Sequence, residues 1–181
     1  DSNAVTVLNG NTTIGGSLTL KNNVTGGTGE IKDSPGTLTV SGNVVFDTTT
    51  TIGSKVNIGS STASLCAIRF LSGAVTIVEN ATLNLLAGSV ASGDVSLTSS
   101  GNIVTSGSGG GTFQKKLDLN ASGSITITNP IFVNGSTPPN PVGLTFRALG
   151  AVALSALSLA GNLNSITPTN LGASSYKAPS P

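Results

Sequence analysis

The chain has 181 residues, which is enough for one domain with a buried core, and it carries few charged or aromatic side chains. Only 8% of the residues are charged and 3% are aromatic, the formal net charge is +1, and there is no histidine. Nucleic-acid binding needs clustered positive charge, which the scattered lysines and arginines do not supply. No apolar run reaches the ~18 residues of a membrane span, so we expect neither a nucleic-acid partner nor a membrane span.

The apolar residues make up 37% of the chain and are mostly Val, Ile, Leu and Ala. β-branched side chains fit the pleated surface of a sheet and lose rotamer freedom in a helix. Gly, Ser, Thr and Asn fill most of the remaining positions and suit tight turns. This composition predicts an all-β fold whose thin layers bury small aliphatic side chains.

One short sequence pattern, which we call the phrase, recurs along the chain. It consists of an outward residue, an apolar residue, a second outward residue and a second apolar residue, and small or polar residues follow it. The phrase begins at Ser17, Thr37, Lys55, Ala74, Asp94, Lys116 and Gly143. The steps between these starts are nearly equal as far as Asp94 and lengthen afterwards. A second row of apolar residues has nearly the same spacing: Val24, Val44, Leu65, Leu83, Ile103 and Ile125. Self-similarity at a fixed period of about 20 residues indicates a repeat architecture.

A period of this length accommodates about three short strands and three turns, which is one coil of a solenoid. We therefore predict a right-handed parallel β-solenoid with coils of about 18–20 residues. Alternation along each strand sends every second residue inward. The prediction stacks one inward apolar residue from each coil on the next: Leu18, Leu38, Val56, Val75 and Val95.

The same pattern predicts how the chain is divided. Residues 1–127 are expected to form the solenoid, and residues 128–165 an irregular loop plus further strands that pack on it or extend it. Residues 136–141, with three prolines, are expected to leave the rod because proline cannot donate to a ladder. Residues 148–161 suit a helix by composition, but they repeat the strand phrase, so we favour strands. Residues 166–181 are expected to form an irregular tail.

One outward position of the phrase predicts a row of small polar groups on a flat face. Its members are Thr19, Thr39, Asn57, Thr76 and Ser96, and Asp118 would follow them. Flat threonine rows on β-solenoids resemble ice-binding surfaces. The simpler interpretation is that threonine is a common outward residue in strands.

Few residues suggest catalysis or metal binding. There is no histidine to act as a general base, and only seven carboxylates are present. Asp94 and Asp118 could share one face, one coil apart, but we expect solvated surface charges rather than an acid pair or a calcium site. Cys66 is the one cysteine, and alternation in its strand places it with Ile68 and Phe70 as a buried residue. We therefore expect no enzyme activity, no cofactor and no metal.

The segments SLTLKNN, TLTVSGN, TTIGSKVNIGSS and ATLNLLAGS resemble the passenger regions of secreted bacterial surface proteins. These include autotransporters and filamentous-haemagglutinin-like exoproteins. The resemblance covers roughly residues 5–127 and rests on composition, period and Asn/Gly corners rather than on a diagnostic motif. It implies export to the cell surface or the extracellular space, and a role in adhesion or as a stalk.

The sequence thus predicts a non-catalytic extracellular protein that forms a rigid stalk or an adhesive surface. Two alternatives stay open: a virion or phage fibre, spike or capsid-associated protein, which would often be trimeric, and a carbohydrate-active β-helix enzyme. The scarcity of charge indicates self-association or a larger assembly, and the surface ligand would be a protein or a glycan. We expect partner contacts near the proline-rich segment, at Pro138, Pro139, Asn140 and Arg147.

Overall fold

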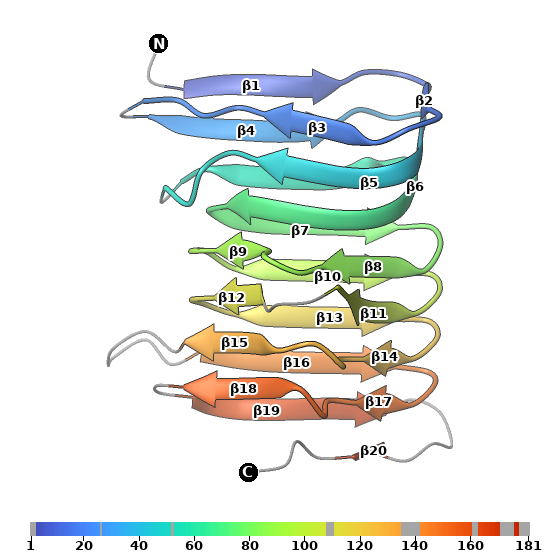
Figure 1. Ribbon diagram of the computed structural model, residues 1–181, viewed down its shortest axis with the longest axis vertical. Coiled ribbons are helices and arrows are strands. Elements are labelled where there is room, and N and C mark those ends of the chain that lie inside the picture. The colour runs from blue at the N-terminus through green and yellow to red at the C-terminus, as the bar shows by residue number, and fades with distance from the viewer. Residues whose placement is uncertain are drawn as a thin grey trace.

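The structure is a computed structural model that describes residues 3–25, 27–51, 53–107, 111–134, 142–160, 163–170 and 176–177. These residues form strands and turns, and among them there is no helix that is long and apolar enough to cross a membrane. The strands stack as coils of a parallel β-solenoid (Figure 1). The chain descends while it runs rightward on the far side and leftward on the near side, which makes the solenoid right-handed.

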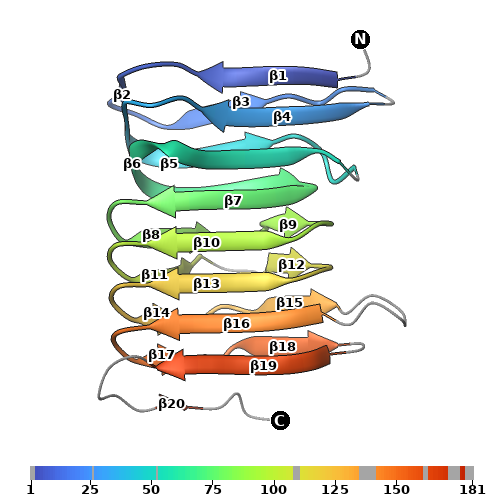
Figure 2. The same cartoon turned by 180° about the vertical axis from the view of Figure 1, so that it is seen from behind.

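A long sheet forms one side of the solenoid and faces the viewer in Figure 2. Parallel pairings join its strands without interruption. In order they are β1 (Asn3–Leu8), β4 (Thr28–Asp33), the start of β6 (Lys55–Ser72), β7 (Ala74–Glu79), β10 (Val95–Ser99), β13 (Leu117–Ala121), β16 (Val142–Ala148) and β19 (Leu163–Asn170).

A front sheet forms the opposite side. Its first strands are β3 (Leu18–Lys21), the end of β5 (Thr37–Asp47) and the end of β6. Each following coil divides the front sheet into two strands, with a bend between them. These are β8 (Leu83–Leu86) with β9 (Val90–Ala91), β11 (Ile103–Ser106) with β12 (Gly111–Phe113), β14 (Ile125–Thr126) with β15 (Ile131–Asn134), and β17 (Val152–Ala153) with β18 (Leu157–Ala160). β20 (Tyr176–Lys177) pairs with β17.

A third, short side exists only in the N-terminal coils among the described residues. It consists of β2 (Thr12–Ile14), residues 37–40 of β5 and residues 62–65 of β6. After β7 the chain turns into the front sheet directly, so the coils change from three sides to two at this level (Figure 1). We call this change in cross-section the step.

The spacing of the repeat varies from coil to coil. Ile31 pairs with Val56, 25 residues further on, whereas Val56 pairs with Val75, 19 residues further on, although both intervals include a segment of the short side. In the later coils, which lack that segment, Val75 pairs with Val95 after 20 residues, and Leu117 pairs with Leu144 after 27.

The predicted stack is therefore wrong in its first two members. Leu18 pairs with Val44 on the front sheet, and Leu38 pairs with Ala63 on the short side. Ile31 takes the predicted place of Leu38 above Val56. The longer N-terminal coils shift the chain by several residues relative to a uniform period.

The core lies between the sheets and consists of aliphatic columns. On the long sheet, one column runs through Val56, Val75, Val95, Leu117 and Leu144, all of which are buried. Stacking like on like at the strand spacing excludes water along the whole column, which no single coil could do alone.

The C-terminal region continues the ladders. β16 pairs with β13, β17 with β14 and β18 with β15, so the region for which we favoured strands over a helix, residues 148–161, contains the strands β17 and β18. β19 extends to Asn170, so the first residues of the expected irregular tail form a strand instead. Residues 136–141, the expected loop, lie outside the described residues.

Candidate functional site

Three of the five predicted outward polar residues lie side by side on the long sheet. Asn57 pairs with Thr76, and Thr76 pairs with Ser96. The row continues through Asp118 and Thr145. Asn57 and Thr76 are exposed and the other three are half-buried, so the row is a polar stripe on a flat face.

Thr19 and Thr39 do not belong to this stripe. Thr19 pairs with Val45 on the front sheet, and Thr39 pairs with Ser64 on the short side. The predicted five-residue row is therefore wrong at these two positions, for the reason given above for Leu18 and Leu38.

Of the four residues predicted to contact a partner, only Arg147 lies within the described residues. This side chain is exposed near the end of β16, and its Nη1 lies 3.6 Å from Oδ1 of Asp118 on the neighbouring strand. Lys116 lies 3.5 Å from the other oxygen of Asp118. Surface ion pairs of this kind contribute about 0–1 kcal/mol to stability. Pro138, Pro139 and Asn140 lie outside the described residues.

The two carboxylates that could have formed an acid pair do not face each other. Asp94 is exposed and accepts a hydrogen bond from the backbone N–H of Lys116, at 3.3 Å. Asp118 pairs in register with Ser96, two residues beyond Asp94, and is engaged by two cations. These positions do not support a two-carboxylate mechanism.

Two other carboxylates, Asp33 and Glu79, point inward at the corner where the long sheet ends. Each continues the inward alternation of its strand, as in Val75–Thr76–Ile77–Val78–Glu79. Sequence reasoning missed both because it treated all charges as surface groups. The alternation along β7 was the available signal, since it places Glu79 on the same face as Val75 and Ile77.

Asp33 closes the corner between the long sheet and the short side. Its Oδ1 accepts hydrogen bonds from the backbone N–H groups of Gly59 (3.1 Å) and Ser60 (3.0 Å). Its Oδ2 accepts the backbone N–H of Ser61 (2.8 Å) and the Ser61 hydroxyl. Burial pushes the pKa of Asp33 upward, but these hydrogen bonds outweigh it and hold the pKa below its usual value.

Glu79 lies at the step, directly beneath residues 62–65 of the short side. Among the described residues, no further strand continues the short side beyond this level. Its side chain is 1% exposed, and its Oε2 accepts the backbone N–H of Leu65 at 2.9 Å. The backbone N–H of Asn80 donates to the carbonyl of Ala63, at 2.8 Å. The lower edge of residues 62–65 is thus capped by an inward-pointing charged residue, a known way to terminate strand pairing.

The second oxygen of Glu79 has no partner among the described residues. Oε1 is buried and receives no hydrogen bond. Burial raises the pKa of Glu79 to about 7, although the backbone N–H groups of Leu65, Asn80 and Ala81 act in the opposite direction. A buried acceptor without a donor is costly, and in a native protein it calls for an explanation.

A surface recess lies beneath the overhanging short side at the step. Residues 61–63 of β6 line it, together with residues 78–80 at the end of β7, residues 98–100 at the end of β10, and Ser122. Its volume is about 290 Å³. We call it the step recess, and it is the candidate site of this protein.

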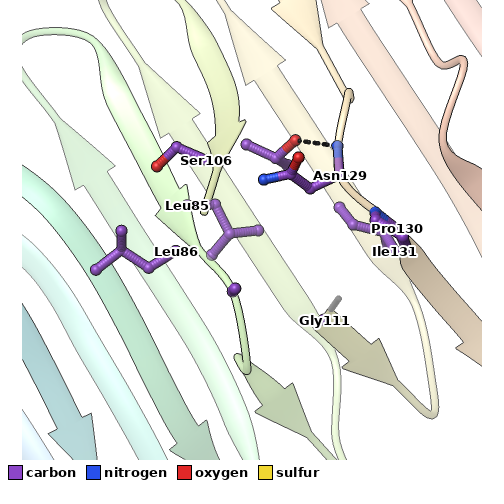
Figure 3. A pocket seen from close by; sticks show the side chains of 9 residues that line it. Leu85, Leu86, Ser106, Gly111, Asn129, Pro130 and Ile131 are labelled. Carbon is purple, nitrogen blue, oxygen red and sulfur yellow. Dashed lines mark hydrogen bonds between the residues drawn. The ribbon is translucent and has the colours of Figure 1, made fainter. Parts of the chain in front are cut away.

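A second cavity lies at the bend of the front sheet and is much smaller (Figure 3). It is lined by Leu85, Leu86, Gly111 and Pro130, among others, and its volume is about 10 Å³, which is room for about one water molecule. The Asn129 backbone N–H beside it donates to Thr105 Oγ1 at 3.0 Å. This cavity is a packing defect at a bend rather than a ligand site.

Cys66 is exposed, and the prediction that it is buried is wrong. The strand turns a corner after Cys66, where Ala67 and Ile68 are both buried in succession. Two consecutive inward residues reset the alternation, so Cys66 does not share a face with Ile68 and Phe70. Within the described part of the chain, no three His, Cys, Asp or Glu side chains gather as metal ligands would.

Comparison with protein-family models, with curated proteins and with solved structures found no match to this chain.

Proposed function

We propose that the protein is a non-catalytic structural rod of the extracellular space or cell surface that serves as a stalk or an adhesive surface. The observation that carries the proposal is the long sheet, in which parallel pairings run without interruption from β1 to β19. A ladder of this kind stiffens the molecule along the stacking direction, because bending it would break backbone hydrogen bonds in several coils together.

The surface chemistry supports a role in contact rather than in catalysis. The flat face presents small polar groups such as Asn57, Thr76 and Ser96, and its charged side chains are of both signs. The ion pairs on this face, Lys55 with Glu30 and Arg147 with Asp118, join neighbouring strands and leave little net charge. A nearly neutral polar surface suits adhesion to another polar surface without long-range repulsion.

The core favours a rod made by one chain over a trimeric fibre. The inward columns of both sheets meet inside a single chain, and the largest side chains, including Phe46, Phe70 and Phe146, are fully buried there. A fibre in which three chains share one axis would need apolar columns that face a partner. The virion alternative therefore relies on contacts at the surface or the ends of the rod.

Two apolar side chains on the outer face of β1 support contact with another copy. Val5 and Val7 are 52% and 47% exposed. Neighbouring exposed apolar side chains on a flat sheet favour association.

Sedimentation velocity and small-angle X-ray scattering test this proposal. We expect an elongated particle that associates as concentration rises, and a double variant Val5→Lys, Val7→Lys that stays monomeric with an unchanged far-UV circular dichroism spectrum. A compact particle would overturn the rod. Association that is identical in the variant would overturn the role of the outer face of β1.

A further inference from the structure

The step recess collects polar side chains that the protein itself does not use. Within the described residues, no hydrogen bond involves the side chains of Thr62, Asn80, Thr98, Ser100 or Ser122. They come from four successive levels of the solenoid and all line one concave surface. Hydroxyl and amide groups of this kind can both donate and accept hydrogen bonds.

The recess also contains an apolar surface. Val78 is 41% exposed between the polar groups. The C–H groups of a ligand could cover Val78. Glu79 belongs to the lining, but its Oε1 is buried beneath the surface, so a ligand in the recess does not contact this oxygen.

The size and charge of the recess narrow the class of ligand. Its volume of about 290 Å³ is at the lower limit of small-molecule sites, so it suits one compact unit rather than a peptide. Glu79 is the one titratable residue of the lining and it is only 1% exposed, so the surface that a ligand meets is uncharged.

We propose that the step recess binds a single neutral sugar unit of a glycan through the free hydroxyl and amide groups of residues 62, 80, 98, 100 and 122. This inference names the ligand class of the adhesive surface proposed above and rests on that function.

The test is a titration of the isotope-labelled chain with free galactose, mannose, fucose and N-acetylglucosamine at millimolar concentrations, followed by backbone amide NMR shifts. We expect at least one sugar to shift the amides of Thr62, Asn80 and Ser100 in a saturable manner. Thr98→Trp fills the recess and is expected to weaken binding at least tenfold. Thr145→Trp is the matched control, because Thr145 is an equally half-buried threonine on the same sheet outside the recess, and it should bind as the parent does.

Glu79→Gln tests whether the exposed lining, rather than the buried carboxyl, holds the sugar. The amide keeps an acceptor for Leu65 and a similar shape, so the recess should persist and sugar affinity should match that of the parent. The inference is overturned if no sugar of the panel causes saturable shifts, if the shifts lie on the flat face instead, or if Thr98→Trp binds as well as Thr145→Trp.

Failure of this inference and failure of the proposed function can be told apart. If scattering shows an elongated particle and no sugar binds, the rod stands and the sugar site falls. If sugar binds in the recess of a compact particle, the rod falls and the site stands.

Discussion

The two buried carboxylates show how the same group behaves differently in neighbouring corners. Asp33 receives hydrogen bonds at both oxygens, and its pKa lies below its usual value. Glu79 has one oxygen without a partner, and its pKa is raised to about 7. At Asp33 the hydrogen bonds to the charged form lower the pKa by more than burial raises it, whereas at Glu79 the loss of hydration raises the pKa by more than the hydrogen bonds lower it.

The raised pKa of Glu79 predicts that stability falls as pH rises. The folded-state pKa of about 7 exceeds the ordinary value of 4.5, so the folded state holds the proton more tightly than the unfolded chain. The free energy of unfolding should therefore be highest below pH 4.5 and fall as pH rises through 7, by up to about 3 kcal/mol from this group.

Urea unfolding followed by circular dichroism at pH 5 and pH 8 would measure this difference. In Glu79→Gln the contribution of this group should vanish, because the amide does not titrate. An equal pH dependence in parent and variant would show that Glu79 is not responsible.

At the scale of the strands, the front sheet depends on aromatic packing across coils. Phe46 pairs in register with Phe70, and the ring of Phe70 lies 5.9 Å from the ring of Phe113. Phe113 pairs with Ala91, whose small side chain lets the two rings meet past it. The ring of Phe113 also packs against Gly111, where a Cβ would come within 3.0 Å of it. The aromatic residues therefore join the end of β6 to β12 although β9 lies between them.

Phe113→Ala should be strongly destabilising because it leaves a cavity beside Phe70. We expect a loss of about 3–5 kcal/mol in the free energy of unfolding. Phe132→Ala is the control: Phe132 lies on β15, which pairs with β12, but its side chain is 44% exposed. Urea unfolding should show a change of less than about 1 kcal/mol for the control. Similar losses in both variants would contradict the packing described here.

The corner between the front and long sheets requires glycine at one level. A Cβ on Gly73 would lie 2.2 Å from the carbonyl oxygen of Ser54 and 2.7 Å from that of Thr51, so backbone would have to move. Gly73→Ala should therefore cost about 1–3 kcal/mol. Gly16→Ala, at a corner with nothing within 4 Å, should leave the melting temperature nearly unchanged. If Gly73→Ala melted like the parent, the close approach of these coils would be wrong.

For the whole molecule, stability should be nearly local along the rod. Each coil contacts its neighbours, so free energies in a solenoid approximate a sum of coil terms and interfaces between adjacent coils. Phe46 in β5 and Phe146 in β16 are both fully buried, and several strands of the ladder separate them.

The variants Phe46→Ala and Phe146→Ala should therefore be additive. The double variant should lose the sum of the two single losses within about 0.5 kcal/mol, measured by urea unfolding. A much smaller loss in the double variant would indicate coupling along the rod that a solenoid of neighbouring contacts does not provide.

Sequence reasoning reached the parallel solenoid because its physical cause is local. Alternation in Val75–Thr76–Ile77 and its return one coil later at Val95 require nothing beyond the strand period and the strand spacing. The same reasoning failed at Thr19, Thr39 and Leu38, because the first two coils span 25 residues instead of the uniform period of about 20, as the pairs Thr6–Ile31 and Ile31–Val56 show.

The sequence by itself determined that this protein is a stack of strands with inward aliphatic columns, since alternation and repeat length are properties of the chain. Only the tertiary structure decided where the coils change from three sides to two. That change places Glu79 under residues 62–65 and opens the step recess beside it. The reason is geometric: a corner is defined by which distant strands stack there, and residues 61, 79, 99 and 122 meet only when their coils lie in register.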